Sequence, residues 1–443
     1  MSGIVGIAGL GNDASVKQML DKIAYRGSLK KVIETASATL GVAYSGSKAT
    51  RLKQQHSGTH DGGGIVGRAV VDQGNGLKIK RDPLGVIPLY YGWTQDGLLC
   101  FSSEVKGLRV VTRDVHELPP GHTFDGRQLK AYYQLKKLPE VINPPRRIAR
   151  ELRRKLESSV EKYVKDRNSG AWLSGGLDSS AMAALARPYL HTFHTFAAGM
   201  PGSPDINYAR IVAGFIQSQH HEIIVKIDDL IAILPEVIYH LESFDAWLVR
   251  SSLMNYLVAR LAAQYVPSVF SGEGGDELFA GYDYLKSLDP SRLADELIDI
   301  TSRLHNTALQ RVDRCASAHG TEAHVGFLDP EIVEYALRIP VRYKLHNGIE
   351  KWILRQAMLD DLPAAVLNRP KAKFWQGAGL QDVLARYAEQ QVTEADFSRE
   401  RRLPNGWLLN SKEELLYYRI FCEQLGHFAD LSWMGRTKGT PVN

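Results

Sequence analysis

A short stretch rich in Gly and Ser contains the residues best suited to chemistry. It reads Ser174, Gly175, Gly176, Leu177, Asp178, Ser179, and it lies between an apolar strand-like run and a helix-like run of small residues. Two glycines let the backbone approach a ligand closely, and the N–H groups at a helix start attract anions. Asp178 would repel a phosphate unless a divalent cation lay between them, and Mg²⁺ binds carboxylate and phosphate oxygens together. The stretch therefore predicts a phosphate site with Mg²⁺.

The alternative for this stretch is a plain helix N-cap. The strand before it and the helix after it favour the phosphate site. It lacks the Gly-Lys-Ser/Thr ending of the commoner phosphate loop. This difference favours attack at the α-phosphate of ATP over transfer of the γ-phosphate.

A second acidic segment follows another strand-like run. It reads Ser271, Gly272, Glu273, Gly274, Gly275, Asp276, Glu277. Because ligands bind at the carboxyl ends of parallel strands, we expect both segments at one edge of a sheet. Asp276 can share the metal with Asp178, which leaves Glu273 for a substrate amine or a proton. The alternative is a Gly-rich turn before an acidic helix start, which the helix dipole favours.

The elements that would position these residues change character near residue 143. Short β-type runs are expected at 3–8, 64–71, 77–80, 89–92 and 98–102. From residue 147 apolar residues recur every four positions, as on a helix, and strand-like runs at 171–173, 194–199, 222–225 and 269–271 alternate with helical ones. We predict a sheet-rich domain over 1–142. Over 143–443 we predict an α/β domain with a doubly wound parallel sheet, mostly helical from about residue 287.

Composition narrows the class of protein. There are 54 Lys and Arg against 49 Asp and Glu, a net charge of +5 that does not indicate a nucleic-acid partner. The three cysteines form no metal-binding pattern and fit a reducing cytoplasm. No apolar run approaches the roughly 20 residues that cross a bilayer, so no membrane partner is expected.

Six further motifs, taken with these two acidic segments, resemble the asparagine synthetase family over nearly the whole chain. They lie at 81–91, 101–106, 118–121, 313–322, 327–329 and 369–374. The resemblance implies an N-terminal nucleophile-type domain that normally hydrolyses glutamine. It implies a second domain of the ATP-pyrophosphatase type that adenylates aspartate, after which ammonia displaces AMP. Family members are often dimers, so a homodimer is possible.

The resemblance also implies roles for single residues. The segment 174–179 would hold pyrophosphate, and Asp178 and Asp276 would bind Mg²⁺. Leu173, Ser271 and Gly272 would line the AMP site. Glu273 would meet the substrate or the attacking amine, and Lys371 would stabilise charge that develops in the transition state.

The N-terminal part departs from the family pattern. Residue 2 is Ser2 where the glutaminase uses a cysteine, and the segment 41–63 is short and contains no Asn-Gly-Glu. Tyr25-Arg26-Gly27-Ser28 keeps only part of the family's His-Arg-Gly-Pro. We therefore expect no glutamine hydrolysis, with ammonia or an amine taken from solvent.

The acceptor pocket departs as well. In the segment 241–252 two family threonines are replaced by Trp247 and Leu248, while Arg250 stays. In Glu322-Ala323-His324-Val325-Gly326 a family arginine is replaced by His324, which is only partly charged near neutral pH. Glu322, His324, Trp247 and Arg250, with Glu273, are the expected substrate pocket. The alternative is that Trp247 is a core residue and His324 a histidine satisfied within the fold.

These observations leave four hypotheses. The first is an AMP-forming amide ligase that acts on a carboxylic acid other than aspartate, with ammonia or an amine. The second is an asparagine synthetase that uses free ammonia. A cyclase like β-lactam synthetase ranks lower, because no tyrosine lies between Arg311 and Glu322. A non-catalytic regulatory protein would have no need for the intact carboxylates and Lys371.

Overall fold

A computed structural model describes residues 3–45, 70–72, 76–164, 168–370 and 383–438. The predicted strand at 64–71 lies mostly outside the described residues, and β4 covers Val70–Asp72. The segment 46–69, which holds most of the shortened glutaminase region, also lies outside them, as do Ser2 and Lys371.

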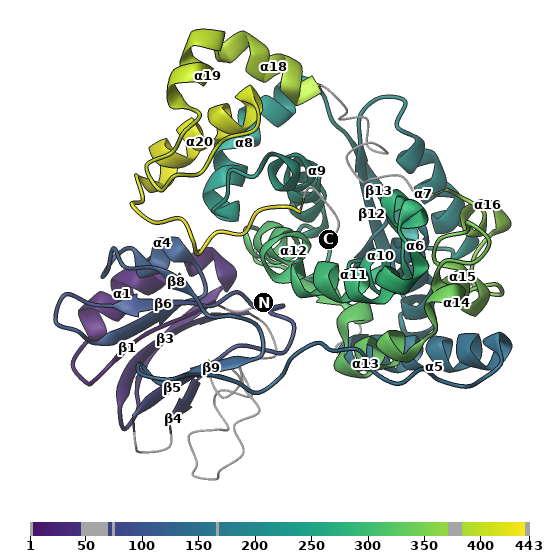
Figure 1. The fold of residues 1–443 in the computed structure, drawn as a ribbon, viewed down its shortest axis with the longest axis horizontal. Helices are drawn as coiled ribbons and strands as arrows, with labels where there is room; N and C mark the ends of the chain where they lie inside the picture. Colours follow the sequence, from purple (N-terminus) through teal and green to yellow (C-terminus); the bar gives the residue numbers. More distant parts are fainter. Residues whose placement is uncertain (1–2, 46–69, 73–75, 165–167, 371–382, 439–443) are drawn as a thin grey trace.

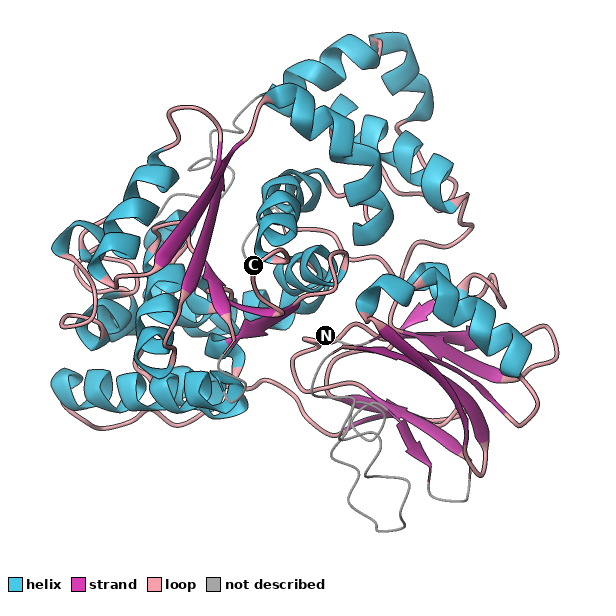
Figure 2. Cartoon of the chain, turned by 180° about the vertical axis from the view of Figure 1, so that it is seen from behind, coloured by secondary structure: helices cyan, strands magenta, loops and turns pink. Residues whose placement is uncertain are grey.

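The N-terminal part is built from two stacked antiparallel sheets (Figure 2). One has the order β2 (Leu29–Glu34), β3 (Ala38–Tyr44), β1 (Gly3–Ala8), β7 (Leu99–Ser102), β6 (Tyr90–Trp93), β8 (His116–Glu117). The other has the order β10 (Leu129–Ala131), β9 (His122–Phe124), β5 (Leu77–Lys80), β4. Strand alternation explains the layering: Ile4 belongs to the core with the second sheet, whereas its neighbour Val5 packs with helix α1 (Asp13–Lys22).

The second part is built on a five-stranded parallel sheet, which confirms the predicted doubly wound sheet (Figure 1). Its order is β13 (Gln219–Ile224), β12 (His194–Gly199), β11 (Gly170–Trp172), β14 (Ser268–Ser271), β15 (Glu322–Val325). The helices between β11 and β14 are α6 (Leu177–Ala186), α7 (Pro204–Phe215), α8 (Ile227–Leu241) and α9 (Ala246–Ala262), and α5 (Pro145–Tyr163) precedes them. The chain builds outward from β11 in one direction and then in the other, so β11 lies at the switch point where such sheets bind ligands.

Some strands differ from the sequence expectations. Strands β2 and β3 were not expected, and β13 begins at Gln219, three residues before the expected start. The described part after residue 287 is mostly helical, as predicted, but Glu322–Val325 forms the unexpected strand β15, which pairs in parallel with β14. The sequence Glu-Ala-His-Val lacks the long apolar run of a buried strand, so it did not predict a strand. Backbone pairing with β14 stabilises it as one.

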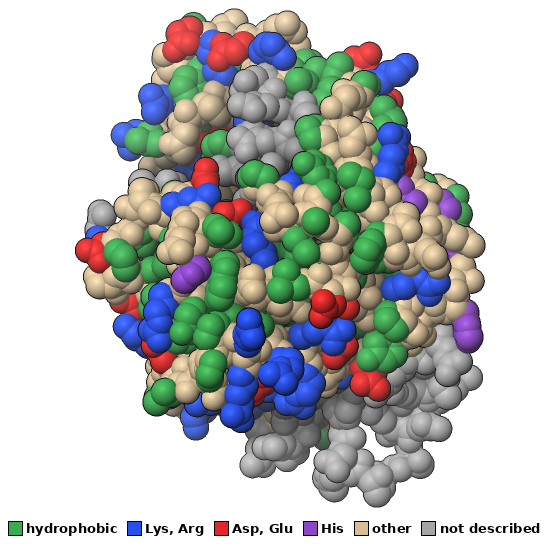
Figure 3. Space-filling view, turned by 90° about the vertical axis from the view of Figure 1, so that its right-hand side faces the viewer, with side chains coloured by type: hydrophobic (Ala, Val, Ile, Leu, Met, Phe, Trp, Pro, Cys, Tyr) green, Lys and Arg blue, Asp and Glu red, His purple; other side chains and the backbone are tan. Residues whose placement is uncertain are grey.

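Helices make up most of the remainder. They are α10 (Gly275–Phe279), α11 (Pro290–Ser302), α12 (Ala308–Ser317), α13 (Pro330–Arg338), α14 (Val341–Lys344), α15 (Trp352–Ala357), α16 (Ala364–Leu367), α18 (Val383–Gln391), α19 (Glu394–Glu400) and α20 (Lys412–Leu425). After α20 the chain returns over the N-terminal part, where Trp433 packs edge-on against Tyr90 at 6.0 Å. In the described part of the chain no helix has the length and apolarity to span a membrane. On the face drawn in Figure 3, Lys and Arg side chains occur beside Asp, Glu and many hydrophobic ones.

Candidate active site

The phosphate loop makes a tight turn between β11 and α6. Gly175 has a φ of +67°, and a Cβ there would lie 2.5 Å from the backbone nitrogen of Ala209, so only glycine fits. The hydroxyls of Ser174 and Ser179 lie 3.1 Å apart. The loop follows β11 directly, so it lies at the carboxyl edge of the sheet, where the phosphate site was predicted.

The second acidic segment packs directly on this loop. A Cβ on Gly272 would lie 2.5 Å from the Ser179 nitrogen, and one on Gly275 would collide with the Asp178 carboxylate. Ser271 ends β14 and Leu173 follows β11, both buried at the same sheet edge. The structure thus brings Asp178 and Asp276 together, and the glycines are what allow this approach.

A lysine that the sequence analysis missed joins the two carboxylates. Lys351 is 2% exposed, and its Nζ pairs with Asp178 and lies 2.6 Å from Oδ1 of Asp276. Gly281 leaves room for it, since a Cβ there would collide with Lys351 Cε. Lys351 lies far from both acidic segments in the sequence, just before α15. Its backbone has an unusual left-handed φ of 55°, but the sequence gives no sign of this conformation.

The residues at this edge fit a Mg²⁺ ion bound together with phosphate. Asp178 and Asp276 both pair with Lys351 in a largely buried place, so two carboxylates lie within reach of one site. Within the described residues, no group of three or more His, Cys, Asp and Glu could hold a metal ion alone. Mg²⁺ ordinarily keeps one or two carboxylates and completes its coordination with phosphate oxygens and water, which is the donor set available here.

The late lysine segment begins against the phosphate loop. Arg369 donates from Nη1 to the Ser174 carbonyl at 3.2 Å, pairs with Asp205, and stacks its guanidinium 4.0 Å from the Tyr208 ring centre. Lys371, two residues on, lies outside the described residues. Arg369 is a second cation at the loop that the sequence reading did not single out, although it stands in the quoted motif.

Two more acidic residues of the second segment have partners. Glu273 pairs with Arg311 of α12, and Tyr282 donates to Glu277. Burial lowers the pKa of Arg311, but Glu273, Cys315 and Tyr282 together outweigh it and raise that pKa. Burial and the neighbouring Asp276 raise the pKa of Glu277 to about 7. Arg311 was not predicted, because nothing in the sequence shows that α12 lies beside the acidic segment.

The expected substrate pocket is only partly assembled in this structure. Arg250 and Trp247 lie together on the first turns of α9, with the guanidinium 5.4 Å from the indole centre. Trp247 is 46% exposed, so it is not a core residue. Arg250 is engaged by Glu413 of α20, with Nε 2.7 Å from Oε1. Its guanidinium fork is therefore already occupied by a carboxylate of this chain.

Glu322 and His324 do not join the loop. In the ladder of β14 and β15, Glu322 lies beside Ser268, the first residue of β14. This is the amino end of the sheet, opposite to the phosphate loop. His324 is level with Phe270 in mid-strand, and its ring stacks on Tyr163 of α5 at 4.5 Å. This matches the alternative of a histidine satisfied within the fold, because the strand β15 carries it into the layer between sheet and helix.

Comparison with known proteins places the chain in a family. The profile described as Asparagine synthase matches residues 151–297 and 287–430, and one described as Glutamine amidotransferase domain matches 51–110. The chain is 36% identical over 371 residues to "Asparagine synthetase B [glutamine-hydrolyzing]" of Escherichia coli (strain K12), covering 78% of this chain and 67% of that protein.

Two plant proteins named "Asparagine synthetase [glutamine-hydrolyzing]" are similar to the same extent. The one from Zea mays is 34% identical over 78% of this chain and 63% of its own length. The one from Sandersonia aurantiaca is 34% identical over 84% of this chain and 76% of its own length. The chain thus spans between 63% and 76% of the length of these three relatives. It belongs to the asparagine synthase family of ATP-dependent carbon–nitrogen ligases.

Proposed function

We propose that this protein is an amide ligase that activates a carboxylic acid with ATP and transfers it to ammonia or an amine. A carboxylate oxygen attacks the α-phosphorus of ATP and pyrophosphate leaves. The nitrogen nucleophile then attacks the acyl carbon of the acyl-adenylate and AMP leaves. The observation that carries this proposal is the convergence of Asp178, Asp276 and Lys351 beside the phosphate loop.

Each part of the site has a task in this scheme. The loop N–H groups, Ser174, Ser179 and Arg369 bind the departing pyrophosphate. Asp178 and Asp276 would hold Mg²⁺, which supplies positive charge to the phosphates. Lys351, and Lys371 where the family resemblance holds, add charge stabilisation to the transition state. Glu273 receives the proton of the attacking ammonia or orients the acid.

We infer that the ammonia does not come from glutamine hydrolysed by this chain. Ser2 replaces the nucleophilic cysteine and no Asn-Gly-Glu is present. Arg26, in the remnant of the glutaminase motif, is fully buried in ion pairs with Glu104 and Asp313 and cannot reach a substrate. We take residues 1–142 as a glutaminase-like domain that has lost this chemistry and 143–443 as the synthetase.

The identity of the acid has two candidates. The engaged Arg250 and the exposed Trp247 favour an acid other than aspartate, since they offer neither a free guanidinium fork nor the family's threonines. The 36% sequence identity to "Asparagine synthetase B [glutamine-hydrolyzing]" favours aspartate as the acid. We place the reaction in the cytoplasm, where Cys100, Cys315 and Cys422 would stay reduced as free thiols, and in a homodimer.

One assay separates these candidates. Pyrophosphate release from ATP and Mg²⁺ would be measured with a panel of carboxylic acids, first with ammonium and then with glutamine as nitrogen source. We expect release with ammonium and none with glutamine alone. Strong release with aspartate would select the second candidate, and activity with glutamine alone would contradict the loss of glutaminase chemistry.

A further inference from the structure

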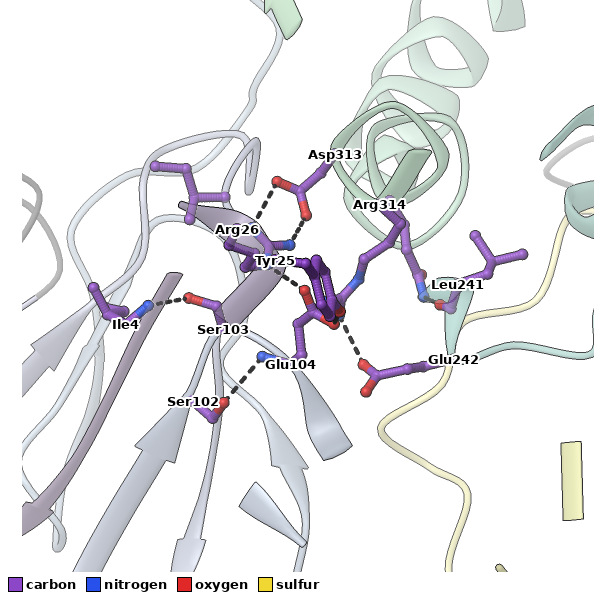
Figure 4. A network of polar contacts seen from close by, with 12 residues as sticks. Ile4, Tyr25, Arg26, Ser102, Ser103, Glu104, Leu241, Glu242, Asp313 and Arg314 are labelled. Carbon is purple, nitrogen blue, oxygen red and sulfur yellow. Dashed lines mark hydrogen bonds and ion pairs between the residues drawn. The ribbon is translucent and has the colours of Figure 1, made fainter. Parts of the chain in front are cut away.

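A cluster of six buried charges lies where the two parts of the chain meet (Figure 4). The N-terminal part contributes Arg26, Glu104 and Lys106, and the synthetase part contributes Glu242, Asp313 and Arg314; each is at most 5% exposed. Three cations therefore meet three anions. Nothing in the proposed chemistry uses these residues, so their presence needs a separate explanation.

The ion pairs of the cluster cross the boundary in both directions. Arg26 binds Glu104 beside it and Asp313 across the boundary. Arg314 forms two further ion pairs, with its Nη1 3.0 Å from Oε2 of Glu104 across the boundary and its Nη2 2.9 Å from Oε2 of Glu242. Burial raises the pKa of Glu104, but Arg314, Lys106 and Arg26 outweigh it and hold that pKa well below its usual range.

Glu242 adds a backbone connection to these pairs. Its carboxylate accepts hydrogen bonds from the N–H groups of Val105 at 2.9 Å and Lys106 at 2.7 Å, in the first turn of helix α4 (Val105–Leu108). Glu242 is itself the C-cap of α8, where it has a left-handed φ of 56°. A side chain of the synthetase part thus caps a helix of the N-terminal domain.

The cluster converges on helix α12. Asp313 and Arg314 lie on it, and Gln310 of the same helix donates to the Leu241 carbonyl at 2.7 Å. Arg311, about one turn before Arg314, is the partner of Glu273 in the active site. The helix that holds Glu273 is therefore itself fixed by the N-terminal domain.

We propose that Arg26 is a positioning residue of the synthetase reaction. Through Asp313 it fixes helix α12, and through Arg311 it fixes Glu273, so the N-terminal domain sets the acceptor side of the active site. This rests on the proposed function, which assigns Glu273 to the acid and the nitrogen nucleophile. The phosphate side is anchored separately, by α6 and Lys351, and is independent of Arg26.

The physical reason is the cost of an unpaired buried charge. Removing the Arg26 cation leaves the Asp313 carboxylate buried without its cross-boundary partner, so α12 must move or admit water to solvate it. Either response changes the place of Arg311. The effect should reach Glu273 and spare the phosphate loop.

The test compares three full-length variants in steady-state pyrophosphate release, with the acid, ammonium and ATP each varied in turn while the other two are saturating. Arg26→Met should raise the KM for the acid and for ammonium by about tenfold, while the KM for ATP stays within about twofold of the wild type. Arg26→Lys, which keeps the charge, should restore most of the loss. The control Arg153→Met removes the ion pair between Arg153 of α5 and Asp361, in which Nε lies 2.8 Å from Oδ2. It should change none of the three KM values.

Hydrogen exchange gives a readout that does not depend on activity. In Arg26→Met, amides of residues 308–317 and 272–277 should exchange faster, with 177–186 unchanged. Unchanged exchange in α12 together with unchanged KM values would overturn the proposal, as would a rise in the KM for ATP equal to that for the acid. If no acid supports pyrophosphate release by the wild type, the proposed function fails, and faster exchange at 272–277 still decides the positioning role.

Discussion

The two buried groups of charges differ in their surroundings. At the sheet edge, Asp178 and Asp276 both pair with Lys351 beside backbone that only glycine allows to come so close, at Gly175 and Gly272. At the domain boundary, Arg26, Lys106 and Arg314 match Glu104, Glu242 and Asp313 one for one. A charged group beside an open, glycine-rich loop at a sheet edge is suited to receive a charged ligand, whereas a group whose charges pair across two packed parts of the chain is suited to hold those parts together. The first therefore indicates chemistry and the second indicates architecture.

Asp276→Asn tests the group at the sheet edge and should have the largest effect on activity. We expect pyrophosphate release to fall by about 10³-fold, because the substitution removes a carboxylate ligand of the Mg²⁺ ion whose charge would stabilise the departing pyrophosphate. The free energy of unfolding should stay within about 1 kcal/mol of the wild type, since the substitution also removes the repulsion between the two carboxylates that share Lys351. Activity above about one tenth of wild type would contradict the metal assignment. Asp361→Asn is the control, expected to keep full activity.

Asp313→Asn should show the reverse pattern in stability. Arg26 would keep only Glu104, and we expect the free energy of unfolding to fall by about 3–5 kcal/mol, measured by urea denaturation. A fall below about 1 kcal/mol would mean that the boundary cluster is not needed for the fold.

A buried histidine beside the cluster gives the protein a pH dependence. His240, whose ring lies edge-on to Tyr25 at 4.5 Å, has its pKa lowered by burial to about 3. The unfolded chain binds this proton near pH 6.5 and the folded chain does not, so His240 should lower the stability by about 1.4 kcal/mol per unit as the pH drops below about 6.5. Burial also lowers the pKa of His319, to about 4, which adds to the same slope. His240→Phe keeps a ring and should reduce this slope in unfolding measured between pH 7 and 5. An unchanged slope would assign the acid sensitivity to other groups.

Ser2→Ala is expected to have the smallest effect. Ammonium-dependent pyrophosphate release should be unchanged, because the synthetase takes its nitrogen from solvent. A marked loss with glutamine as nitrogen source would show that Ser2 is a nucleophile. Arg369→Ala, assayed beside it, should lose activity and serve as the positive control.

The sequence predicted those features that local patterns encode. The Gly and Ser spacing predicted the loop at 174–179, and the alternation of strand and helix predicted the parallel sheet. Lys351, Arg311 and Glu413 escaped notice because their roles depend on partners more than 35 residues away, which no periodicity marks. His324 and Glu322 were misplaced for the same reason: β15 is a strand only because β14 lies beside it.

The most direct test of acid activation follows oxygen atoms. A carboxylic acid that supports pyrophosphate release would be labelled with ¹⁸O in its carboxylate, incubated with ATP, Mg²⁺ and ammonium, and the AMP examined by mass spectrometry. The account predicts one ¹⁸O atom in the AMP phosphate, because the acid oxygen attacks the α-phosphorus and leaves with AMP. Unlabelled AMP, or ADP as the product, would contradict it.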